Sequence, residues 1–150
     1  MKRTMLICVA LSLWFALTVG CSEDEGVEEE KQYVYGAMAV YNMANSMLDV
    51  SIVTDGRSND FGVLIADATK TMGGGQFELG KELKVVWIEN FGKENATKLE
   101  ATFDTSQLVD IADKIREVEF VYIGDRKWKL RAYKALHRYD QDLIREITSD

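Results

Sequence analysis

Side chains that commonly carry out acid–base or nucleophilic chemistry are scarce in this 150-residue chain. It contains one histidine, His137, and two cysteines, Cys8 and Cys21. His137 lies between Leu136 and Arg138 in a segment with helical periodicity, where a surface histidine is a simpler interpretation than a general base. No Gly-x-Ser-x-Gly nucleophile motif occurs. We therefore expect no catalytic residue and no enzymatic activity.

Two loops offer a superficial likeness to metal or phosphate sites. Residues 55–60 (Asp-Gly-Arg-Ser-Asn-Asp) supply oxygen ligands, but Arg57 occupies a ligand position and no glutamate follows at the twelfth position of a calcium loop. The glycines at 73–75 are followed neither by Gly-Lys-Ser/Thr nor by a helical pattern. We expect a turn at 55–60 and a flexible connection or bulge at 73–75, with no metal and no cofactor.

The charged residues suggest one surface. Residues 126–138 contain six basic residues and no acid, and Lys127, Lys129 and Arg131 share one face of an expected strand. This row could contact lipid phosphates or an acidic protein partner. Alternatively, it neutralises nearby acids such as Glu117 and Glu119, which are expected to lie on solvated faces or in ion pairs.

The first twenty residues have the organisation of an export signal. Two basic residues, Lys2 and Arg3, precede fifteen uncharged and mostly apolar residues at 5–19, and Gly20 precedes Cys21. As a helix, fifteen residues would span about 22 Å, less than the roughly 30 Å of a bilayer's hydrocarbon core. A cleaved signal peptide at 1–20 is therefore favoured over a transmembrane anchor.

Residues 17–21 (Leu-Thr-Val-Gly-Cys) resemble the lipobox of bacterial lipoproteins. The resemblance implies cleavage before Cys21 and lipidation of Cys21, so that its acyl chains hold the protein on a membrane. Ser22 follows the cysteine, which resembles lipoproteins forwarded to the outer membrane and implies a domain that faces the periplasm. The alternative is an ordinary signal peptide with an incidental cysteine.

An acidic tether follows at 21–32. Residues 22–30 contain six acidic residues, and the flexible part of the tether would span roughly 15–20 Å. The chain carries 18 basic and 25 acidic residues, a net charge of −7, whereas the part from Lys31 onward has 16 basic and 19 acidic residues, a net charge of −3. Because phosphate backbones repel an anionic protein, we expect no nucleic-acid partner.

The remaining residues, 33–150, are expected to form a single β-rich domain. Alternating apolar residues predict strands at 33–41, 48–53, 61–66, 83–87 and 99–103. Residues 117–133 predict a hairpin in which Glu119 faces Arg131. A helical pattern at 107–115 predicts one short helix, and an apolar stripe through Leu136, Tyr139, Leu143, Ile144 and Ile147 predicts a C-terminal amphipathic helix. About seven strands without a βαβ pattern indicate an antiparallel sandwich or meander.

Several segments also resemble an uncharacterised family of small proteobacterial lipoproteins. The resemblance is carried by residues 40–42 (Val-Tyr-Asn), 73–75 (Gly-Gly-Gly) and 84–87 (Lys-Val-Val-Trp), and by Phe120 with the dipeptide 124–125 (Gly-Asp). Some members look like immunity proteins to phospholipase effectors of type VI secretion. The resemblance implies a non-enzymatic protein-binding module, with a secreted lipase toxin as the candidate partner. An envelope-maintenance lipoprotein that contacts membrane or peptidoglycan is the alternative.

Overall fold

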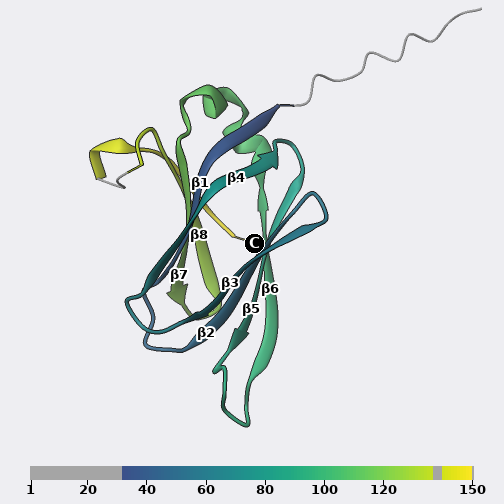
Figure 1. Cartoon of the computed structure of the whole chain (residues 1–150), viewed down its shortest axis with the longest axis vertical. Helices are drawn as coiled ribbons and strands as arrows, with labels where there is room; N and C mark the ends of the chain where they lie inside the picture. Colours follow the sequence, from purple (N-terminus) through teal and green to yellow (C-terminus); the bar gives the residue numbers. More distant parts are fainter. Residues whose placement is uncertain (1–31, 137–139, 150) are drawn as a thin grey trace, which may run out of the picture.

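The alternation of apolar and polar residues is realised as two packed β-sheets in a computed structural model, which describes residues 32–136 and 140–149. Figure 1 shows the two layers. One sheet has five strands in the order β4-β1-β7-β8-β9, and the other has four in the order β3-β2-β5-β6. The strands are β1 (Tyr33–Asn42), β2 (Leu48–Thr54), β3 (Arg57–Leu64), β4 (Thr69–Glu78), β5 (Glu82–Glu89), β6 (Thr97–Asp104), β7 (Glu117–Gly124), β8 (Lys127–Tyr133) and β9 (Leu143–Thr148).

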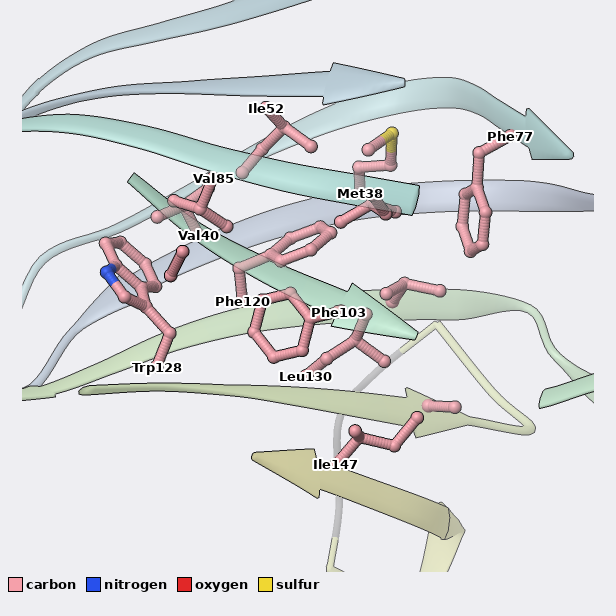
Figure 2. Packing of buried hydrophobic residues seen from close by; sticks show 14 of the residues in the cluster. Met38, Val40, Ile52, Phe77, Val85, Phe103, Phe120, Trp128, Leu130 and Ile147 are labelled. Carbon is pink, nitrogen blue, oxygen red and sulfur yellow. The ribbon is translucent and has the colours of Figure 1, made fainter. Parts of the chain in front are cut away.

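The hydrophobic core lies between the sheets. Along β2 and β8 every second side chain is buried, as the two-residue period of a strand requires. Figure 2 shows Ile52 and Val85 from the four-stranded sheet meeting Val40 and Phe120 from the five-stranded sheet. These residues belong to one continuous buried cluster. The prediction of a mainly β sandwich is therefore confirmed.

The predicted hairpin at 117–133 is confirmed in its register. β7 and β8 pair antiparallel, with Glu119 opposite Arg131. Of the two alternatives for Glu117 and Glu119, a solvated face or an ion pair, the first is wrong, because these residues are only 1% and 5% exposed. The hydroxyl of Tyr133 donates a hydrogen bond to Glu119 at 3.1 Å.

The prediction of a C-terminal amphipathic helix is wrong for the described residues. Leu143, Ile144 and Ile147 lie in β9, which pairs antiparallel with β8 and places Ile147 in the core opposite Leu130. The short 3₁₀ turn η2 (Asp140–Asp142) precedes this strand, and Tyr139 lies outside the described residues. The pairing of β9 satisfies the outer backbone groups of β8, a tertiary effect that outweighs the helical spacing of the apolar residues.

Two other details of the predicted architecture are corrected. The described residues contain nine strands rather than about seven, because β4 and β9 lie in segments that were assigned to a connection and to a helix. The sandwich is also not wholly antiparallel, since β1 and β7 run parallel. The chain reaches β7 by crossing from the four-stranded sheet through η1 (Thr105–Lys114), as a parallel pairing requires.

The short helix predicted at 107–115 is present as the 3₁₀ helix η1. Its N-cap is Asp104, whose side chain accepts a hydrogen bond from the backbone N–H of Ser106 at 2.9 Å. The contact with Ser106 lowers the pKa of Asp104 below its ordinary value. Leu108 and Ile111 turn inward, so that η1 closes the end of the sandwich where β1 begins (Figure 1).

The two expected loops are shorter or absent. At 55–60 the turn comprises only Asp55 and Gly56, whose φ angles of 48° and 74° suit a two-residue hairpin, and the following residues belong to β3. The glycines at 73–75 lie inside β4, not in a connection that enters the next strand. The bulge expected as the alternative is present: between the pairs Gly36–Gly75 and Met38–Met72, Gly73 and Gly74 of β4 lie opposite one residue of β1.

Gly36 should be intolerant of a side chain. A Cβ there would press against the carbonyl oxygen of Arg116, which also accepts the backbone hydrogen bond of Ala37 at 3.1 Å. We expect Gly36→Ala to lower the free energy of unfolding by about 1–3 kcal/mol through overpacking. Gly73→Ala is the matched control, because nothing lies within 4 Å of a Cβ at Gly73. Urea denaturation of both variants checks this, and equal midpoints would contradict the close approach of β1 to Arg116.

Candidate functional site

The structure places the predicted basic row on the outer face of the five-stranded sheet. Lys127, Lys129 and Arg131 alternate along β8 with the buried Trp128 and Leu130. Cys21 and His137 fall outside the described residues, so the structure bears on neither.

Two of the three cations in the row share one carboxylate of β9. Lys129 Nζ lies 2.6 Å from Glu146 Oε1, and Arg131 Nε lies 2.7 Å from Glu146 Oε2. The hydrogen bond from Lys129, with a further contribution from Arg131, lowers the pKa of Glu146 below its ordinary value. Sequence analysis missed Glu146 because the segment around it was assigned to a helix. The described structure therefore leaves Lys127 as the more exposed member of the row.

A second surface of interest lies at the end of the sandwich opposite η1 (the lower end in Figure 1). We call it the loop end and define it by four connections: residues 43–47, 65–68, 90–96 and 125–126. They link β1 to β2, β3 to β4, β5 to β6, and β7 to β8. Both sheets therefore contribute to this end.

The side chain of Asn42 joins two of these connections. It is fully buried, and its Nδ2 donates hydrogen bonds to the carbonyls of Ser46 at 2.6 Å and Ile65 at 3.1 Å. Its Oδ1 accepts from the backbone N–H of Ala44 at 3.1 Å. The backbone of Asn42 also accepts from the N–H of Asp67 at 2.8 Å. One residue at the end of β1 thus fixes the positions of its own connection and of the β3–β4 connection.

Further backbone hydrogen bonds tie the β1–β2 connection to β7 and to the β5–β6 connection. The N–H of Met43 donates to the carbonyl of Tyr122 at 2.9 Å, and the N–H of Phe91 donates to the carbonyl of Met47 at 3.2 Å. The loop end is consequently held by bonds between segments that are distant in sequence.

Beneath the loop end lies an aromatic cluster that couples the two sheets. The ring centroids of Trp87 and Trp128 are 5.5 Å apart, and those of Tyr122 and Trp128 are 5.1 Å apart. Trp87 comes from β5 and the other two from β7 and β8. Both indole nitrogens are buried without a hydrogen-bond acceptor, so ring packing holds the tryptophans. In Figure 2 the nitrogen of Trp128 lies on the side of its ring that points away from Phe103 and Leu130.

Tyr122 adds a polar link between the sheets. Its hydroxyl donates to Glu89 Oε1 at 2.7 Å and accepts from the backbone N–H of Arg126 at 3.2 Å. Arg126 Nε lies 3.5 Å from Glu89 Oε2. Burial, reinforced by the hydrogen bond to Glu89, raises the pKa of Tyr122 to about 12. The hydroxyl therefore stays protonated at neutral pH and serves as a fixed donor.

The loop end also carries most of the exposed apolar side chains. Of the six large hydrophobic residues that are exposed in the described structure, four lie at or beside its connections: Met43, Met47, Ile65 and Ile123. We call these four the apolar loop tips. Ile65 is the most exposed, at 61%, because β3 ends at Leu64 rather than at residue 66 as predicted.

An open pocket of about 400 Å³ lies elsewhere, beside the β2–β3 and β4–β5 turns. Its walls combine acidic and basic side chains: Asp55, Glu78 and Glu82 with Lys81 and Lys84. Asp55 Oδ2 accepts the backbone N–H of Glu78 at 3.0 Å, which gives this carboxylate a structural role between the turns. Within residues 32–136 and 140–149, no group of three or more histidine, cysteine or acidic side chains is arranged to hold a metal ion.

Comparisons with known proteins add no relative. No protein-family model, no curated protein and no solved structure matches this chain. Among the described residues, no helix has the length and apolar character needed to span a bilayer.

Asn42 should be required for the stability of the loop end. Asn42→Ala removes the donor for Ser46 and Ile65, and we expect it to lower the free energy of unfolding by about 2–3 kcal/mol. Asn45→Ala changes an exposed asparagine in the same connection and should cost less than about 0.5 kcal/mol. Urea denaturation distinguishes the two, and equal effects would show that the Asn42 hydrogen bonds contribute little.

The ion pairs of Glu146 should make the free energy of unfolding depend on pH in the acidic range. Because the folded state lowers the pKa of Glu146, its contribution is present at neutral pH and is lost as pH falls through the folded-state pKa. At pH 7, Glu146→Gln should be less stable than the wild-type protein. Below about pH 4 the wild-type protein should lose this advantage, and the two stabilities should converge. Denaturation midpoints of both proteins from pH 7 to pH 3 check this. Parallel curves would mean that the pairing with Lys129 and Arg131 is not coupled to folding.

Proposed function

We propose that this chain is a membrane-anchored lipoprotein whose β-sandwich acts as a non-enzymatic protein-binding module in the bacterial periplasm. The proposed anchor is lipid on Cys21, supported by the lipobox-like residues 17–21. The family resemblance narrows the candidate partner to a secreted lipase toxin, which the sandwich would inhibit as an immunity protein. The residues that could act as an acidic tether, 22–32, would keep the domain close to the membrane and raise its effective concentration there.

The observation that supports the binding role is that buried tyrosine hydroxyls donate hydrogen bonds to carboxylates inside the sandwich. Burial and hydrogen bonding raise the pKa values of Tyr122 and Tyr133, both to about 12. For each tyrosine burial is the main cause, and each donates its hydroxyl proton to a carboxylate, Glu89 or Glu119. A general acid or base works best when its pKa is near the working pH. These pairs are therefore suited to stiffening the sandwich, and a stiff scaffold with fixed loops suits recognition by shape.

The envelope-maintenance alternative would use the basic row to contact membrane or peptidoglycan. The ion pairs of Lys129 and Arg131 with Glu146 weaken it, because both cations already share a carboxylate within the domain and about half of their charge is balanced. Charge reversal at Lys127, Lys129 and Arg131 tests the alternative: salt-sensitive binding to anionic vesicles or sacculi that these changes abolish would support it over a protein partner.

The proposed function predicts two features of the full chain purified in detergent from the bacterium that encodes it. Its N-terminal peptide should begin at Cys21 and carry the mass of diacylglycerol and an amide-linked acyl chain. A distinct protein should co-purify in a stoichiometric amount and survive washing with high salt. An unmodified Cys21 or retained residues 1–20 would contradict the anchor. The absence of any stoichiometric protein, in cells where the partner is produced, would contradict the binding role.

A further inference from the structure

We propose that the loop end, rather than the basic row of β8, is the docking surface, and that the apolar loop tips insert into an apolar recess of a folded partner protein. This inference rests on the proposed function and adds to it the surface and the chemistry of the partner.

The distribution of exposed apolar side chains is the first argument. The loop end carries Met43, Met47, Ile65 and Ile123, whose exposed fractions range from 38% to 61%. The remaining two large exposed hydrophobic residues in the described structure are separate from it: Val109 lies in η1, and Leu136 follows β8. Apolar side chains gathered in this way are typical of binding surfaces. Methionine in particular adapts its flexible side chain to the shape of a partner.

The fixed backbone beneath the tips is the second argument. Asn42 holds the connections that carry Met43 and Ile65, and the hydrogen bond between Phe91 and Met47 holds the neighbouring connection. Loops that are already ordered lose less conformational entropy on binding than mobile loops do. The tips are therefore presented in a form that favours association.

The point where the chain enters the domain indicates what kind of partner the loop end contacts. β1 begins with Tyr33 at the η1 end, and its ten residues span about 30 Å at roughly 3.3 Å per residue before the loop end. Under the proposed function the chain is anchored at Cys21 and enters the described domain at the η1 end, so the loop end lies about the length of β1 from the point where the chain enters. The loop end is therefore open to a partner in the periplasm.

The size and shape of the surface favour a partner with a recess over a second copy of this chain. A stable interface buries about 800 Å² on each partner, more than four half-exposed side chains alone provide, so the partner must also reach the connections around the tips. Projecting loop tips also match a concave surface better than they match each other. An apolar recess would bury the tips fully, and the surrounding polar connections would form the rim.

Site-specific photo-crosslinking in living cells tests this inference on the full chain. Benzoylphenylalanine replaces Met47 or Ile65 at the loop end, Thr148 on the outer face of β9 beside Lys129, and Val109 in η1 as the control. We expect one protein adduct of defined mass at Met47 and Ile65 and none at Val109. The crosslinked protein is then identified from its peptides, purified, and titrated against wild-type and variant full chains.

In that titration, Met47→Asp and Ile65→Asp should each weaken binding about tenfold or more, whereas Val109→Asp should leave it within about twofold. Equal denaturation midpoints establish that the variants fold, and Met47→Ser and Ile65→Ser replace any aspartate variant that does not.

The other outcomes separate this inference from the proposed function. A protein adduct at Thr148 but not at the loop end would overturn the docking surface and leave the binding role intact. Adducts at the loop end that contain lipid, or a second copy of this chain, would overturn the partner. A lack of protein adducts at every position would contradict the binding role itself.

Discussion

A single buried carboxamide, that of Asn42, holds together much of the end of the sandwich where β1 gives way to β2. Its nitrogen and oxygen bond to backbone groups of Ser46, Ile65 and Ala44. Burying an amide is costly unless its hydrogen bonds are satisfied, so this arrangement favours one conformation of the connections strongly over others. The exposed Met43 and Ile65 depend on it for their positions.

The two ends of the domain differ in what they expose: one is covered by η1, and the other displays apolar side chains. At one end η1 covers the core, and β1 receives the chain from the N-terminal region. At the other, the aromatic cluster of Trp87, Tyr122 and Trp128 supports connections that display apolar side chains. If the chain is anchored through Cys21, the chain enters the domain at the end opposite the displayed side chains. Anchoring and recognition would then occupy separate ends of one small sandwich.

Sequence analysis predicted the parts of this fold that depend on local pattern. The β7–β8 hairpin could be predicted with its register because the burial of alternate residues and the pairing of Glu119 with Arg131 both specify it. β9 could not, since Leu143, Ile144 and Ile147 also match a helical period, and only the neighbouring β8 decides between the two. The shared face of Lys129 and Arg131 could be predicted, but their ion pairs with Glu146 depend on that same long-range pairing.

The loop end was beyond sequence analysis for a related reason. Asn42 bonds to a carbonyl that lies 23 residues away, and a lone asparagine before a polar turn gives no sign of such a contact. Ile65 was assigned to a strand because it continues an apolar run, whereas β3 ends one residue earlier and leaves it exposed. A local signal that would have indicated the site is the pair of methionines at 43 and 47, which border a connection instead of continuing a strand.

Amide hydrogen exchange tests most directly whether the loop end is held in one conformation. The N–H groups of Met43, Ala44 and Asp67 lie in the connections and donate to acceptors of Tyr122 in β7 or of Asn42 in β1. They should exchange slowly, at rates close to those of core amides in β2, and Asn42→Ala should accelerate Ala44 and Asp67 selectively. Fast exchange of these three amides in the wild-type protein would show that the connections are mobile, and the tips would then not be preformed for docking.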